Sequence, residues 1–186
     1  MIETIEKNGY LLSIDYDQDA ENPRIAFDNL GTLYIPRPPR HCAMSDDRAS
    51  AGEAAAAPVV LPVYVIDHSG IAISERPFGC PWDSWQAGCM YVTEKKLLAE
   101  YGQNTTETRE IAKKRLRGEL QEYAAYVSGE VYGYTITRES DGEELDSCEG
   151  YYGEDGIKYI KEVFEDFIKE QYKRDNPLFA YAGIEA

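Results

Sequence analysis

The chain has 186 residues and carries 34 Asp and Glu against 19 Lys and Arg, which gives a formal charge of −15. A field of that sign repels free nucleic acid and anionic membrane surfaces, so neither is expected as a direct partner and basic proteins are favoured instead. Hydrophobic residues make up 43% of the sequence, which is the composition of a globular protein and not of a disordered one.

The sequence contains no targeting or membrane-spanning pattern. Its first ten residues, MIETIEKNGY, lack the apolar stretch of a secretory signal, and no run of 18 apolar residues occurs. We therefore expect a cytoplasmic protein whose cysteines are free thiols rather than disulfides. These cysteines are Cys42, Cys80, Cys89 and Cys148.

Apolar and alternating patterns predict five strands in the first half of the chain. They are Tyr10–Tyr16, Thr32–Ile35, Val59–Asp67, Ile71–Ser74 and Gly88–Val92. The segment from Leu61 to Val92 holds both tryptophans, and we expect the other elements to pack around it. Residues 40–58 contain few large apolar side chains, which predicts a flexible loop insertion with a helical turn in its alanine run.

Apolar residues at three- and four-residue spacing predict helices in the second half of the chain. They are expected from Thr93 to Gly102, from Thr105 or Thr106 to Gly129, and before Asn176-Pro177.

Two further strands, Val131–Arg138 and Glu143–Cys148, are predicted to form a hairpin before the last helix. Hairpin turns outnumber crossover patterns along the whole chain. The sequence therefore predicts a single α+β domain over residues 1–186, with a largely antiparallel β-sheet packed on one face by two or three helices.

Cys80, Cys89 and His68 are candidates for a thiol nucleophile and its base, because a cysteine needs an adjacent base to become reactive. Small hydrophobic cysteines in a sheet core are the alternative interpretation. Zinc favours ligand pairs two to four residues apart, whereas Cys80 and Cys89 lie nine apart, so no metal site is expected. No cofactor motif occurs, since GYYGEDG lacks the spacing and the lysine of a phosphate-binding loop.

Three aspartates, Asp15, Asp17 and Asp19, have the spacing that opens a calcium loop. Ala20 stands where the sharp turn requires glycine, and Ala26 stands where a bidentate glutamate is needed. Calcium binding is therefore not expected.

Residues 139–155 contain eight acids and no Lys or Arg. A strand places alternate carboxylates about 7 Å apart on one face, which is comparable to the phosphate repeat of a nucleic-acid strand. We expect this stretch to bind a basic partner, with aromatic residues as anchors; a solvated hairpin is the alternative. The predicted partner-binding residues are Glu139, Asp141, Glu143, Glu144, Asp146, Glu149, Tyr151, Tyr152 and Trp82.

The loop from Cys80 to Gly88, CPWDSWQAG, is expected mainly to pin the fold through Trp82 and Trp85, because indole rings cover a large area. The alternative is a binding patch centred on the same two rings.

Several segments together resemble a family of small acidic proteins encoded in phages and mobile elements. These segments are NPRIAFDNLGTL, LPVYVIDHSGIAIS, PFGCPWDSWQAGCMYV, GEVYGYTI and LDSCEGYYG. Trp85 and Cys89 depart from the family pattern, which has Gly and a large apolar residue at these positions. The resemblance covers most of residues 22–153, apart from the insertion at residues 40–59. It implies a mobile-element product in a bacterial cytoplasm, but it implies no reaction and no catalytic residue.

This setting, together with the charge, predicts an acidic accessory protein that binds and inhibits a host nucleic-acid-binding defence complex by nucleic-acid mimicry. The expected partner is a host protein or nucleoprotein complex with a basic surface. A small cysteine-dependent enzyme and a structural or regulatory protein of the element are the alternatives, and a homodimer through the tyrosine-rich surface stays open.

Overall fold

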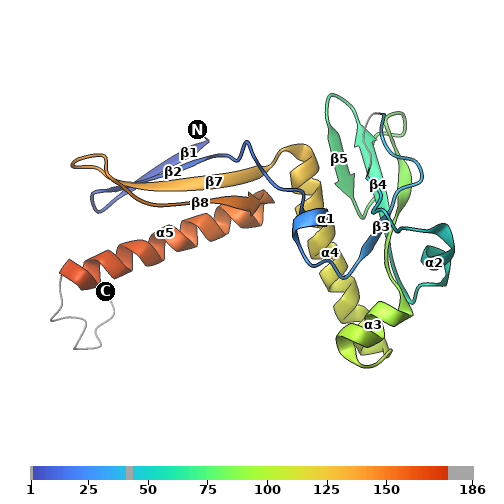
Figure 1. The fold of residues 1–186 in the computed structure, drawn as a ribbon. Coiled ribbons are helices and arrows are strands. Elements are labelled where there is room, and N and C mark those ends of the chain that lie inside the picture. Colours follow the sequence, from blue (N-terminus) through green and yellow to red (C-terminus); the bar gives the residue numbers. More distant parts are fainter. Residues whose placement is uncertain (1, 41–43, 176–186) are drawn as a thin grey trace. The chain divides into compact units, whose positions relative to one another are not determined.

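The computed structural model describes residues 2–40 and 44–175, and within them the chain forms two compact units with separate hydrophobic cores. We call residues 1–20 and 130–186 the terminal unit, and residues 21–129 the central unit. The α+β class is confirmed, but the strands form two four-stranded antiparallel sheets instead of one (Figure 1). None of the helices in the described ranges is long and apolar enough to cross a membrane.

In its described residues, 2–20 and 130–175, the terminal unit is a four-stranded sheet with one helix along one face (Figure 1). In sheet order its strands are β1 (Glu3–Lys7), β2 (Tyr10–Tyr16), β7 (Val131–Arg138) and β8 (Glu144–Tyr152), and α5 (Gly153–Asp175) is the helix. Leu12 and Ile136 lie opposite each other on β2 and β7 and are fully buried. They pack with Phe164 of α5, so the alternating pattern of these strands turns its apolar side toward the helix.

The sequence pattern does not predict β1, because ETIEK places a single large apolar residue, Ile5, toward the core. Pairing with β2 stabilises it, and Asn8 and Gly9 join the two strands with φ angles of 53° and 80°. An Asn-Gly pair with positive φ at both positions is the usual two-residue hairpin turn, so the sequence contained a signal for this strand.

Over residues 21–40 and 44–129, the central unit is a second antiparallel sheet with four helices. In sheet order its strands are β3 (Thr32–Tyr34), β6 (Ser84–Val92), β4 (Val59–Asp67) and β5 (Ile71–Ser74). The helices are α1 (Pro23–Ala26), α2 (Ala51–Ala56), α3 (Glu94–Tyr101) and α4 (Thr106–Ser128). The predicted helix ends of α3 and α4 are confirmed, since Thr93 and Thr105 are their N-caps and Gly102 and Gly129 end them in the left-handed conformation.

The described part of residues 40–58 contains α2 at the helical turn expected in the alanine run, and the flexibility of the loop stays a prediction. Ser50 caps α2 by accepting a hydrogen bond from the Glu53 amide, and Met44 is 3% exposed in the core of the central unit. The segment has few apolar residues, but Met44 and Ala54 are buried and anchor it. His41 and Cys42 lie outside the described residues.

Candidate functional site

The acidity of the chain is concentrated in the terminal unit. Its residues include 20 Asp and Glu against 7 Lys and Arg, a formal charge of −13, whereas the central unit has 14 against 12, a charge of −2. The terminal unit is also the smaller of the two. The field that would attract a basic partner therefore comes almost entirely from this unit.

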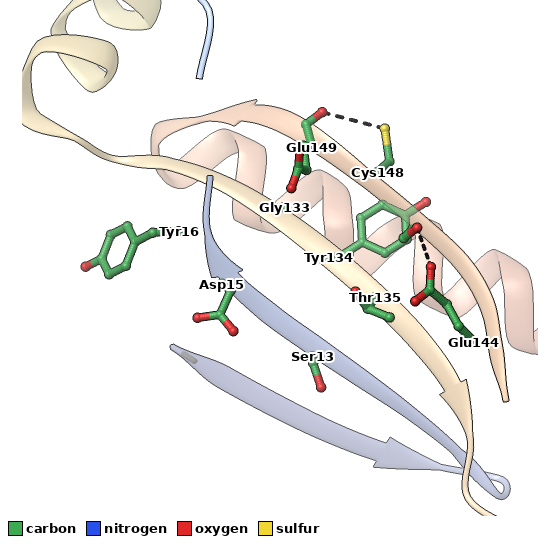
Figure 2. A pocket seen from close by; sticks show the side chains of 10 residues that line it. Ser13, Asp15, Tyr16, Gly133, Tyr134, Thr135, Glu144, Cys148 and Glu149 are labelled. Atoms are coloured by element: carbon green, nitrogen blue, oxygen red, sulfur yellow. Dashed lines mark hydrogen bonds between the residues drawn. The ribbon is translucent and has the colours of Figure 1, made fainter. Parts of the chain in front are cut away.

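The sheet of the terminal unit has one face away from α5, which we call the open face. Alternation along the strands puts polar residues there, and the face contains a hollow of about 500 Å³ (Figure 2). The hollow is lined by Ser13 and Asp15 of β2, Thr135 of β7, and Glu144, Ser147 and Glu149 of β8. These groups are carboxylates and hydroxyls, with no Lys or Arg among the lining residues.

Gly133 on β7 forms part of the floor of this hollow. A Cβ atom at this position would lie 2.8 Å from Cγ of Glu149 and 3.2 Å from the Cys148 carbonyl oxygen. Because Gly133 has no side chain, the side chain of Glu149 can lie over the backbone of β7. A register shift opposite Gly133 inserts an extra residue in β8, where Gly150 has a φ of 86°.

The predicted binding residues at the hairpin tip are partly neutralised. Arg138 donates to Asp141 at 2.9 Å and to Glu143 at 2.6 Å, so the two carboxylates share one cation. A hydrogen bond from the Glu143 amide and the Arg138 guanidinium lower the pKa of Asp141 below its usual value. Glu139 is exposed beside them.

The expected row of alternating carboxylates along β8 is wrong. A register shift beside Ile136 separates Glu144 from Asp146, and Asp146 turns toward α5 instead of sharing the open face. There it accepts a hydrogen bond of 2.8 Å from the Tyr134 hydroxyl. Burial and this acceptor raise the pKa of Tyr134.

The two predicted tyrosine anchors are half-buried at the end of β8. Tyr151 stacks on Tyr159 of α5 with ring centroids 6.0 Å apart and packs against Tyr134 at 5.7 Å. Burial and, as the second cause, a hydrogen bond with the Cys148 thiol raise the pKa of Tyr151 to about 12. Tyr151 therefore contributes to the core of the terminal unit, and a partner role for Tyr151 and Tyr152 stays a prediction.

Trp82 belongs to the central unit and its side chain is 90% exposed in the loop between β5 and β6. The expectation that it pins the fold is wrong, but its exposure is compatible with the alternative, a binding role. Trp85 has the structural role, because its ring packs on the core and its Nε1 donates to the Arg37 carbonyl at 2.8 Å.

The three candidate catalytic residues do not assemble into one site. His68 Nδ1 lies 2.9 Å from Asp83 Oδ2, and the Cys80 thiol donates to the same oxygen over 3.5 Å. An oriented His–Asp pair therefore exists, but the thiol contacts the carboxylate and not the imidazole, unlike a Cys–His nucleophile pair. Three cysteines, Cys80, Cys89 and Cys148, are free thiols as predicted.

Cys89 lies elsewhere on the sheet, opposite Pro62 in the β4–β6 ladder. Pro62 precedes His68 by six residues, a separation of about 20 Å along an extended chain. Burial raises the pKa of the Cys89 thiol, which disfavours the reactive thiolate. In the parts of the chain that the structure describes, no His, Cys, Asp and Glu cluster could hold a metal ion.

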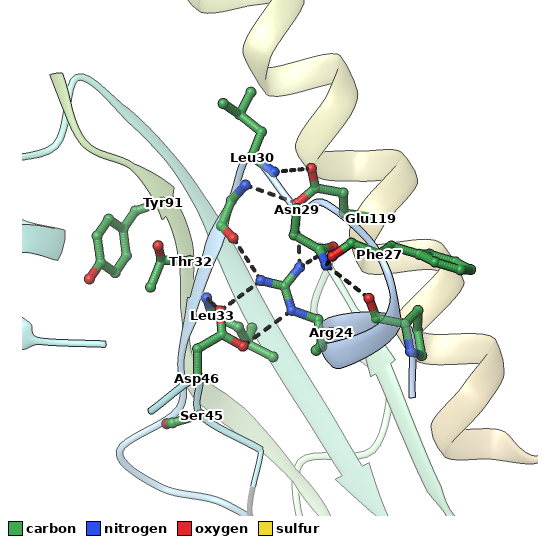
Figure 3. Close-up of polar contacts among 12 residues, drawn as sticks. Arg24, Phe27, Asn29, Leu30, Thr32, Leu33, Ser45, Asp46, Tyr91 and Glu119 are labelled. Carbon is green, nitrogen blue, oxygen red and sulfur yellow. Dashed lines mark hydrogen bonds and ion pairs between the residues drawn. The ribbon is translucent and has the colours of Figure 1, made fainter. Parts of the chain in front are cut away.

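A buried polar centre of the central unit was missed by the sequence reasoning (Figure 3). Arg24 of α1 is 5% exposed and contacts Asp46 at 2.7 Å and Glu119 of α4 at 3.3 Å. Glu119 also accepts from the amides of Leu30 and Gly31 at 2.8 and 2.9 Å. Because buried charges need several partners, this network is a structural crosslink between α1, residue 46 and α4.

Ser13 and Asp15 are the other residues that the sequence reasoning did not place in a binding site. The alternation in Tyr10–Tyr16 offered the signal, since residues 13 and 15 must point away from the apolar positions of that strand.

Searches of protein-family models, curated proteins and solved structures return no match to this chain, so the fold and the site stand on their own geometry.

Proposed function

We propose that the terminal unit binds the basic surface of a host nucleic-acid-binding complex, such as a defence system, and occupies that surface in place of nucleic acid. The observation that carries the proposal is the concentration of a −13 charge on a unit whose open sheet face presents carboxylates and hydroxyls. Such a field steers a basic partner toward the face and speeds association.

The mimicry rests on the field and not on a regular copy of a phosphate chain. Asp15 of β2 and Glu149 of β8 lie on the two strands that flank Gly133 of β7. Their backbones are therefore two strand spacings, or about 10 Å, apart. Glu144 lies about 16 Å further along β8. Carboxylates that come from such separate backbone positions suit separate Lys and Arg side chains of a protein surface, each of which also finds hydroxyl acceptors nearby.

The test uses the tagged full chain as bait in lysate of a bacterial host, with and without nuclease, and mass spectrometry of the captured proteins. The decisive variant is Glu144→Gln with Glu149→Gln, which removes two charges from the open face. The matched control is Glu162→Gln with Glu170→Gln, which removes two charges from exposed positions on α5.

A nucleic-acid-binding complex that the wild type and the control capture, and that the open-face variant loses, supports the proposal. The purified complex should then lose its nucleic acid in the presence of the wild-type protein, with a steep dependence on salt. Equal capture by all three proteins, or capture that depends on nucleic acid in the lysate, contradicts it.

A cysteine-dependent enzyme is the second candidate, because Asp83 orients His68 beside the Cys80 thiol. Thiol chemistry at this place requires the imidazole to turn from Asp83 toward Cys80. The rate at which an electrophilic thiol probe labels Cys80 measures whether His68 activates this thiol. If the labelling rate of Cys80 in wild type equals that in the His68→Ala variant, no catalytic pair exists.

A further inference from the structure

The central unit has a groove whose chemistry differs from that of the open face. It has a volume of about 700 Å³, within the range of small-molecule sites. Its walls come from residues 24–32, residues 46–53 and the first turns of α3, and Figure 3 shows part of the first two walls. The groove residues used below are Phe27, Asp47, Arg48, Glu53, Lys95 and Lys96.

Four cations line the groove, of which Arg24 is held by Asp46 and Glu119, and the other three are Arg48, Lys95 and Lys96. Lys96 is fixed in the wall, where its Nζ donates to the Leu30 carbonyl and the Thr32 hydroxyl, both at 3.2 Å. Arg48 and Lys95 are exposed and have no ion-pair partner within the described ranges. Unpaired cations are attractive sites for an anion, because no protein carboxylate has to be displaced.

Two of the three carboxylates in the groove already have partners. Asp46 is held by Arg24 at 2.7 Å and accepts from the Leu33 amide, while Glu53 accepts from the Tyr91 hydroxyl at 2.9 Å. Asp47 remains as an exposed acceptor. The balance of the groove is thus cationic in a chain whose total charge is −15.

Two further features favour a phosphate that carries a planar group. Thr93, the N-cap of α3, also lines the groove. The backbone amides at the N-terminus of α3 therefore add to the positive potential of the lysines. Phe27 is 45% exposed on the groove wall and offers a ring for stacking.

We infer that this groove binds a nucleotide, with Arg48, Lys95 and Lys96 on the phosphates, Phe27 against the base and Asp47 as acceptor for ribose hydroxyls. The inference does not depend on the partner proposed for the open face. It assigns the central unit a small-molecule ligand and leaves protein binding to the terminal unit.

The test is calorimetric titration of the full chain with ADP, ATP and, separately, inorganic pyrophosphate. Arg48→Ala with Lys95→Ala should weaken nucleotide binding at least about tenfold, because two charge-assisted contacts are lost. Arg37→Ala with Lys114→Ala removes the same charges from exposed positions outside the groove and should leave binding unchanged. Phe27→Ala should weaken nucleotides and leave pyrophosphate unaffected.

Saturable nucleotide binding with this pattern supports the inference. It is overturned by the absence of saturable binding at millimolar nucleotide, by an equal loss in the control pair, or by pyrophosphate binding as tightly as ADP. All five substituted side chains are exposed, and matching thermal unfolding midpoints would exclude a folding defect.

Discussion

The two units handle charge in opposite ways. The central unit buries an ion network, with Arg24 5% exposed between Asp46 and Glu119, and has an almost balanced charge. The terminal unit pairs its cations on exposed positions and leaves an excess of acids. Its paired cations are Lys7, Arg138, Lys158, Lys161 and Lys169. Charge therefore crosslinks one unit and forms the surface field of the other.

The sharpest test of this contrast is removal of one cation from each unit. Arg24→Ala leaves Asp46 without its cation and Glu119 with Arg115 alone, and should cost about 3–5 kcal/mol of unfolding free energy. Lys7→Ala breaks an exposed pair with Glu165 and should cost less than about 1 kcal/mol. Urea denaturation followed by tryptophan fluorescence reports the central unit, which holds both tryptophans. Equal effects of the two substitutions would refute the contrast.

Phe164→Ala tests whether the units unfold separately. The ring is 1% exposed in the core of the terminal unit, and its removal should cost about 3–5 kcal/mol there. Far-UV circular dichroism should then show an early transition that tryptophan fluorescence does not follow. Coincident transitions would instead support the single cooperative domain that the sequence predicts.

Gly133→Ala tests the shape of the open face. The new methyl group would meet Glu149 Cγ at 2.8 Å and the Cys148 carbonyl at 3.2 Å, so β8 has to shift at a cost of about 1–3 kcal/mol. Gly118→Ala on α4 is the control, because nothing lies within 4 Å of that position. Thermal unfolding followed by circular dichroism compares the two, and an unchanged midpoint for Gly133→Ala would contradict the close approach.

The terminal unit should also lose stability at high pH. Burial raises the pKa of Tyr134 and raises that of Tyr151 to about 12, above an unfolded value of about 10. The folded state holds these protons more tightly, so the stabilisation is complete below about pH 10 and is lost as the pH rises toward 12. Tyr134→Phe with Tyr151→Phe should flatten this decline, as measured by circular dichroism at increasing pH. An unchanged decline would assign it to other groups.

The smallest expected effect on stability is that of Glu144→Gln with Glu149→Gln. Both side chains are exposed, so the unfolding free energy should change by less than about 0.5 kcal/mol per substitution. Partner binding should fall while stability holds, which separates the surface field from the fold. A large loss of stability in urea denaturation would show that these carboxylates are structural.

Much of the local structure followed from the sequence, because periodicity and caps act over a few residues. Val59–Asp67 and Ile71–Ser74 are strands as predicted, and Gly102 and Gly129 end their helices as expected. The sequence pattern is incomplete where distant residues decide the outcome. Residues 44–57 looked unanchored because Arg24 and the buried position of Met44 are not visible in the local pattern.

For the candidate site, too, the sequence determined some features and the tertiary structure determined others. The sequence by itself determined the acidity of residues 139–155 and, through alternation, which residues of β2 point away from the core. Only the tertiary structure decided that Arg138 pairs with both Asp141 and Glu143, and that a register shift in β8 sends Asp146 to the face opposite Glu144. A charge is a property of a residue, but its partner and its face depend on strand register, which long-range pairing sets.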